Sequence, residues 1–134
     1  MSAESSAPGD SAGRWESGRP LWSAAPGNRD GVALLSLAGE LDLAAVEGLE
    51  HVLGEALDDA GDGLVVDMTT VSFCDSSCLN ALLRAAARIR AAGARFALVA
   101  VSPAVVRPIT VLNLGEALPI TGSLAEAVKL VRAR

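Results

Sequence analysis

The residues of this chain that could do chemistry gather in one short stretch, CDSSC, at residues 74–78. Two adjacent serines follow an aspartate and lie between two cysteines. These residue types could form a nucleophilic site, a metal or redox site, or a serine that another enzyme modifies. They could also do no more than begin a helix.

A catalytic serine or cysteine needs a base within hydrogen-bond reach and a group that orients the base. The only histidine is His51, which lies on the polar side of a predicted helix, and the sequence has no Gly-x-Ser-x-Gly motif. We therefore expect no catalytic activity.

The two cysteines, Cys74 and Cys78, are four residues apart. A zinc site would need two more ligands, and the chain has no further cysteine and no histidine cluster. Cysteine is also a common small buried residue. We expect both to be packing residues and expect neither a metal nor a cofactor.

Ser76 and Ser77 lie where a buried strand gives way to a helix. One of them is expected to cap the helix, which stabilises it by about 1 kcal/mol. Free backbone N–H groups and the helix dipole also tolerate an anion there. A phosphate on Ser76 would add roughly −1.5 to −2 charges beside Asp75 and near Asp42, so it would alter what docks on that surface.

The apolar pattern predicts the elements that position this stretch. Buried or edge strands are expected at residues 21–24, 32–39, 64–68, 95–101 and 117–121. Helices are expected after Asp42, from the two serines to Gly93, after Ser102 and after Ser123, with a turn at residues 27–31. Pro108 should kink or split the third of these helices. Strands that alternate with helices predict an α/β fold with a largely parallel sheet.

Composition limits the class of protein. The 134 residues are 51% hydrophobic and 20% charged, which predicts one soluble domain, at residues 21–134, after a disordered extension at residues 1–20. No apolar run approaches the roughly 20 residues of a membrane span, and no secretory signal is expected. Two cysteines fit a reducing cytoplasm. A net charge of −5 and four aromatic residues disfavour nucleic acid as a partner.

The net charge hides an asymmetry. Residues 31–75 contain ten acidic residues and no lysine or arginine, whereas residues 76–134 contain eight basic residues and two acids. Either the two halves neutralise each other in the fold, or an acidic face steers a basic partner.

Three stretches resemble the STAS domain family and, within it, the bacterial anti-sigma factor antagonists: LAGELDLAAVEGLE, LVVDMTTVSFCDSSCLNALLRA and ALVAVSPAVVRPITVLNLGEALPITGSLAEAV. They follow the family's order and spacing over about residues 21–131. The resemblance implies a four- to five-stranded mixed, largely parallel sheet with helices mainly on one face.

The resemblance also implies a site and its partners. The phosphorylated serine of such antagonists corresponds to Ser76, and the two motif aspartates correspond to Asp75 and Asp42. An anti-sigma factor that is itself a serine kinase binds the unphosphorylated antagonist and releases a sigma factor. Phosphorylation by that kinase ends the binding, and a serine phosphatase restores it. The implied partner-binding residues are Asp42, Asp75, Ser76, Ser77, Cys78 and Leu79.

One residue departs from the family pattern. Cys78 stands where the family most often has glycine, which permits close backbone approach. The thiol could select another partner or mark a domain that is not phosphorylated efficiently, and Ser77 offers a second hydroxyl. The alternative function is a STAS subunit without a serine switch that scaffolds a lipid-transport or stress-signalling complex.

Overall fold

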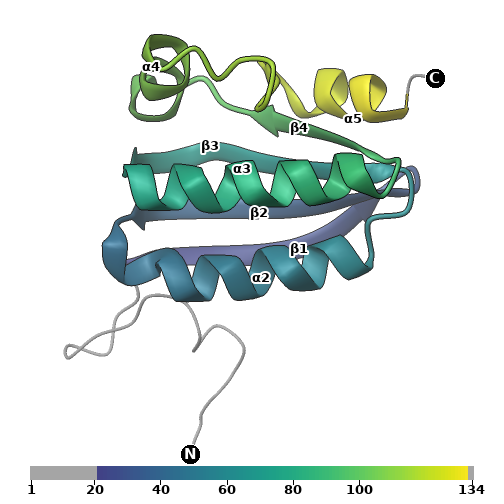
Figure 1. Ribbon diagram of the computed structural model, residues 1–134, viewed down its shortest axis with the longest axis horizontal. Coiled ribbons are helices and arrows are strands. Elements are labelled where there is room, and N and C mark those ends of the chain that lie inside the picture. Colours follow the sequence, from purple (N-terminus) through teal and green to yellow (C-terminus); the bar gives the residue numbers. More distant parts are fainter. Residues whose placement is uncertain (1–20, 133–134) are drawn as a thin grey trace, which may run out of the picture.

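A computed structural model describes residues 21–132 (Figure 1). The elements in chain order are β1 (Trp22–Arg29), β2 (Val32–Leu41), η2 (Leu43–Ala45), α2 (Val46–Asp58), β3 (Gly63–Cys74), α3 (Ser76–Ala91), β4 (Arg95–Val99), α4 (Pro103–Val111), β5 (Ile120–Thr121) and α5 (Leu124–Arg132). The expected extension at residues 1–20 lies outside the described residues.

The five strands form one sheet in the order β1-β2-β3-β4-β5. β1 is antiparallel to β2, and every other neighbouring pair is parallel. The prediction of a mixed, largely parallel sheet of four or five strands is confirmed. β5 is a two-residue edge strand inside the segment where an edge strand was expected.

Three helices cover one face of the sheet and one helix covers part of the other. Alternate residues of β3 divide between two cores, because successive side chains of a strand point to opposite faces. Leu64 and Val66 pack with α2, α3 and α4, whereas Val65 packs with Val128 and Val131 of α5. Figure 1 shows α2 and α3 side by side across the same face. The expectation of helices mainly on one face is confirmed.

The first strand is longer than the sequence indicated. β1 runs to Arg29, and a two-residue turn at Asp30 and Gly31 joins it to β2. Both turn residues have positive φ, of 55° and 83°, as a type I′ hairpin requires. The expected five-residue turn at residues 27–31 was therefore too long, and Pro26 is tolerated because β1 is an edge strand.

The strand that leads to CDSSC is also longer than expected. β3 continues beyond Met68 to Cys74, and its pairing with β2 is irregular at two places. At each place β3 contributes one residue more than β2, which is the signature of a β-bulge. The bulges let polar residues face outward while β3 reaches the end of β2.

The remaining helix predictions have mixed outcomes. Ser102 accepts a hydrogen bond from the Ala104 N–H at 3.1 Å, and Ser123 accepts one from the Glu126 N–H at 3.2 Å, so both expected caps are confirmed. Pro108 was expected to kink or split its helix, and the split is wrong, because α4 is one continuous helix. Pro108 lies one turn after Ala104, so the only hydrogen bond lost is a single one near the start of the helix.

Among residues 21–132, no helix combines the length and the apolar character that crossing a bilayer requires.

Candidate functional site

The site lies at the carboxyl ends of β2 and β3, where both strands lead into helices. Leu41 and Cys74 are register partners, and the Asp75 N–H donates to the Leu41 carbonyl at 3.0 Å. The residues that follow these strands, Asp42 and Asp75, are thereby brought to the same edge of the sheet, as the alternation of strands and helices predicted.

Asp42 begins the first of the two helical segments. Its carboxylate accepts a hydrogen bond from the Ala44 N–H at 3.1 Å, and its backbone is extended. The predicted N-cap is confirmed, although the segment that it caps is the short 3-10 turn η2, which leads directly into α2. The Asp42 carboxylate is therefore held by the backbone of η2.

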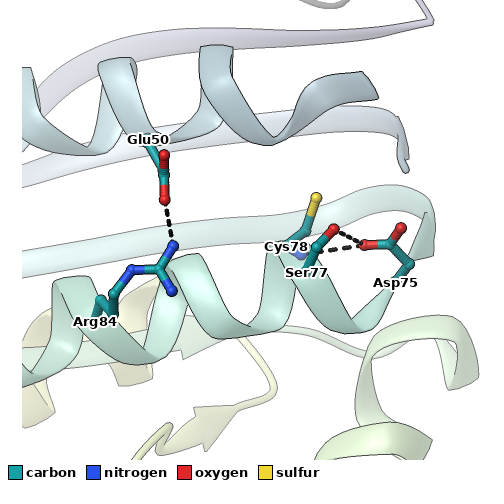
Figure 2. A network of polar contacts seen from close by, with 5 residues as sticks. All are labelled: Glu50, Asp75, Ser77, Cys78 and Arg84. Atoms are coloured by element: carbon teal, nitrogen blue, oxygen red, sulfur yellow. Dashed lines mark hydrogen bonds and ion pairs between the residues drawn. The ribbon is translucent and has the colours of Figure 1, made fainter. Parts of the chain in front are cut away.

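Asp75, and not a serine, caps α3. One carboxylate oxygen of Asp75 accepts from the Cys78 N–H at 3.1 Å and from the Ser77 hydroxyl at 2.6 Å (Figure 2). The expectation that Ser76 or Ser77 caps the helix was wrong. The aspartate is favoured because its backbone is still extended, as an N-cap requires, while both serines are already helical.

The same contacts set the ionisation of Asp75. Partial desolvation raises the pKa of its carboxyl, but the hydrogen bonds from Ser77 and Cys78 outweigh it and lower the pKa from its usual value. Asp75 is therefore an anion at neutral pH.

The two serines have different surroundings. Ser77 is half-buried, and its hydroxyl is engaged with Asp75. Ser76 is exposed at the first position of α3, and its hydroxyl has no hydrogen-bond partner among the described residues. Of the two hydroxyls, only that of Ser76 is both accessible and uncommitted.

The two cysteines are buried and unpaired. The Cys78 thiol donates to the Asp42 carbonyl oxygen at 3.4 Å, which links the start of α3 to the end of β2. Burial, with the neighbouring Cys78 and Asp75 charges, raises the pKa of the Cys74 thiol to about 12. Burial, with the charge of Asp75, raises the pKa of the Cys78 thiol to about 12 as well. The prediction that both are packing residues is confirmed.

Leu79 is 3% exposed and Cys78 is not exposed at all. Of the six residues expected to bind a partner, these two therefore lie beneath the surface. The other four, Asp42, Asp75, Ser76 and Ser77, are exposed or half-buried at this edge.

Among residues 21–132, no histidine is hydrogen-bonded to Ser76 or Ser77. The Nε2 atom of His51 lies 3.4 Å from a carboxylate oxygen of Glu55 on the exposed side of α2, one helical turn away. Within the described range, no group of three or more histidine, cysteine, aspartate or glutamate side chains could hold a metal ion.

Comparisons with known proteins agree with this geometry. A sequence profile of the family described as "Mlab, STAS domain" matches residues 25–125. The chain belongs to the STAS family. It is 32% identical over 105 residues to the anti-sigma-F factor antagonist RsfB of Mycobacterium tuberculosis, covering 78% of this chain and 85% of RsfB.

Solved structures of anti-sigma factor antagonists have a similar fold. An anti-sigma factor antagonist from Mycobacterium paratuberculosis superposes with a TM-score of 0.78 and 29% identity, covering 84% of this chain and 95% of that one. The unphosphorylated form of the antagonist SpoIIAA shares the fold, with a TM-score of 0.65 and 24% identity, covering 82% of this chain and 96% of that one.

Two apolar side chains that were not predicted from the sequence also lie at the candidate site. Leu43, next to Asp42, is 72% exposed, and Phe73, two residues before Asp75, is 47% exposed. Phe73 is the register partner of Glu40 on β2, and both side chains are exposed. Phe73 lies between the exposed Ser72 and the buried Cys74. Its exposure could be predicted only from the positions of the β3 bulges, which the sequence does not show.

The acidic half of the STAS domain is only partly neutralised. Glu50 of α2 forms an ion pair with Arg84 of α3, the one contact drawn between these helices in Figure 2. Across residues 21–132, no lysine or arginine lies within ion-pair distance of Asp42 or Asp75. The edge that carries Ser76 therefore presents uncompensated negative charge beside exposed apolar side chains.

Proposed function

We propose that this protein is an anti-sigma factor antagonist that binds an anti-sigma factor with serine kinase activity and is switched off by phosphorylation of Ser76. It would thereby regulate transcription that depends on a sigma factor, and a serine phosphatase would restore it. The relatives named above are anti-sigma factor antagonists by name. One observation supports the serine switch in this chain, the exposed Ser76 hydroxyl, which has no hydrogen-bond partner among the described residues.

The contrast between the serines supports Ser76 as the acceptor. Phosphorylation of Ser77 would require its hydroxyl to leave Asp75, which would cost a charge-assisted hydrogen bond. Phosphorylation of Ser76 breaks no hydrogen bond within the described residues. The first position of α3 also offers the positive end of a 16-residue helix to the phosphate.

The surroundings of Ser76 explain how a phosphate would end binding. The partner would pack on Leu43 and Phe73 and place positive charge toward Asp42 and Asp75. An added charge of roughly −1.5 to −2 changes the shape and hydration of that surface while the helix itself tolerates it. The same fold is known in a phosphorylated form in SpoIIAA of Bacillus.

Cys78 need not prevent this switch. The thiol points away from the surface toward Asp42, and its backbone N–H is used by Asp75. Replacement of the family glycine by this cysteine therefore changes the packing beneath the site and leaves its outer surface unchanged. We propose direct partner contacts for Asp42, Asp75, Ser76 and Ser77, and a supporting role for Cys78 and Leu79.

A second candidate function is suggested by the description of the matching family, which names Mlab. In that case the chain would be a scaffold subunit of a lipid-transport or stress-signalling complex with no serine switch. The two candidates differ in the effect of a phosphate on Ser76.

Mass spectrometry after incubation with ATP and the cognate kinase tests the acceptor. We expect one phosphate on wild type and on Ser77→Ala, and none on Ser76→Ala. A phosphate that persists in Ser76→Ala would refute the assignment. No phosphate on wild type, with recovery of transport proteins in place of a kinase in a pull-down, would favour the scaffold.

A further inference from the structure

A basic cleft lies between the β1–β2 hairpin and α5. Figure 1 shows that this hairpin lies at the end of the sheet opposite to the start of α3. Its volume is about 450 Å³. The residues that line it are Arg29, Asp30, Ala125, Val128, Lys129 and Arg132.

The register of the hairpin directs Arg29 into this cleft. Arg29 is the partner of Val32 across the antiparallel pair, and side chains directly opposite each other share a face. Val32 packs against α5 in the smaller core, together with Val128. The Arg29 side chain therefore lies on the face of the sheet that α5 covers.

The hairpin lines one side of the cleft, and one side of α5 lines the other. Ala125, Val128, Lys129 and Arg132 follow the spacing i, i+3, i+4 and i+7, which places them along one side of a helix. The two small apolar side chains come first along the helix, and the two cations lie toward its end.

The cations of this cleft are uncompensated. Arg29, Lys129 and Arg132 make no hydrogen bond and no ion pair with any residue between 21 and 132, and Asp30 is the one acid in the lining. Some other arginines are engaged, such as Arg84 with Glu50 and Arg95 with the Leu130 carbonyl at 3.3 Å. The lining therefore holds three cations and one carboxylate, in a protein whose net charge is −5.

We propose that this cleft binds a compact phosphorylated small molecule with two or more negative charges. The two guanidinium groups suit the paired oxygens of phosphate, and Lys129 adds a further cation. The cleft volume falls within the range of small-molecule sites. The negative charge of the rest of the surface would repel a long polyanion, so the ligand must fit within the cleft.

Because Ser76 lies at the other end of the sheet, the two proposals fail independently. Calorimetric titration of the full chain with inorganic pyrophosphate at low ionic strength tests the cleft. We expect saturable binding by wild type that weakens at least about tenfold in Arg29→Gln and in Lys129→Gln/Arg132→Gln. The matched control is Arg88→Gln, which removes an exposed arginine of α3 that is likewise unengaged within residues 21–132.

Binding by the control should stay within about twofold of wild type, and unchanged melting temperatures will show that all variants are folded. Absence of saturable binding by wild type would overturn the proposal. Equal weakening by Arg88→Gln would also overturn it, because the effect would then be a general response to charge. Tighter binding of a hexaglutamate peptide than of pyrophosphate would replace the small molecule with an acidic polypeptide.

Discussion

The hydrogen bonds of Asp75 make a stability prediction that separates its role in the fold from its proposed role in partner binding. In Asp75→Ala the Cys78 N–H loses its cap, at about 1 kcal/mol. The Ser77 hydroxyl also loses its acceptor, at about 1 kcal/mol. We therefore expect the free energy of unfolding to fall by about 2 kcal/mol, or about 8 °C in melting temperature for a domain of this size.

Two further variants complete the test by urea unfolding. Asp75→Asn keeps a cap acceptor and should lose about half as much. Ser77→Ala removes only the hydroxyl, so a double-mutant cycle with Asp75→Ala should give a coupling energy of about 0.5–1 kcal/mol. Strictly additive effects of the two substitutions would mean that the Asp75–Ser77 contact contributes nothing. An unchanged stability of Asp75→Ala would refute Asp75 as the cap.

Ionisation of Asp75 adds a pH dependence with a definite sign. Its folded pKa is lowered from the usual value of 3.8, so the stability that the anion contributes is present above about pH 3.8 and is lost as pH falls through the folded value. The difference in stability between wild type and Asp75→Asn should therefore shrink below pH 3.8.

Two more predictions concern a glycine of β2 and the two buried thiols. Gly39→Ala should lower the free energy of unfolding in urea by about 3 kcal/mol, because a Cβ there would lie 2.3 Å from the Leu21 carbonyl oxygen at a φ of +94°. The control is Gly54→Ala, where a Cβ would meet nothing within 4 Å, and it should raise the free energy of unfolding by about 0.5–1 kcal/mol. Equal effects of the two substitutions would contradict the packing around Gly39. Stability should also fall between pH 9 and 12, by up to about 1.4 kcal/mol per pH unit for each thiol, because the folded pKa of Cys74 and Cys78 is raised from 9.0 to about 12. Few other groups titrate in this pH range, because the chain has no tyrosine and only one lysine, Lys129. The loss of stability at alkaline pH should therefore largely disappear in Cys74→Ala/Cys78→Ala. Its persistence in that variant would contradict the burial of the thiols.

Much of the fold could be predicted from sequence because the apolar periods are strong. The buried strand of residues 64–68 and the helix that follows the serines were both located correctly. The extent of β3 could not be, because its outer half is held by pairing with β2 through two bulges and carries exposed polar residues with no regular alternation. The position of α5 on the second face of the sheet could not be predicted either. The central strands are apolar on both faces, so their sequence does not indicate which face a given helix covers.

At the candidate site, the sequence predicted which residues come together but not which structural role each one has. Asp75, Ser76 and Ser77 are all good helix-capping residues, and only the backbone geometry shows that the aspartate occupies the cap. Once Asp75 takes that role, Ser77 becomes its donor and Ser76 is left exposed. The orientation of the Cys78 thiol toward the Asp42 carbonyl depends on contacts between residues 36 positions apart, which spacing along the chain does not reveal.

The proposed function requires a phosphate on Ser76 to control the binding of an anti-sigma factor. Calorimetric titration of the cognate anti-sigma factor with unphosphorylated wild type, with the stoichiometrically phosphorylated protein and with Ser76→Ala tests it most directly. We predict tight binding by the unphosphorylated protein and by Ser76→Ala, and affinity at least about a hundredfold weaker after phosphorylation, which corresponds to about 2.8 kcal/mol. Equal affinity of the two phosphorylation states for the anti-sigma factor would contradict the account.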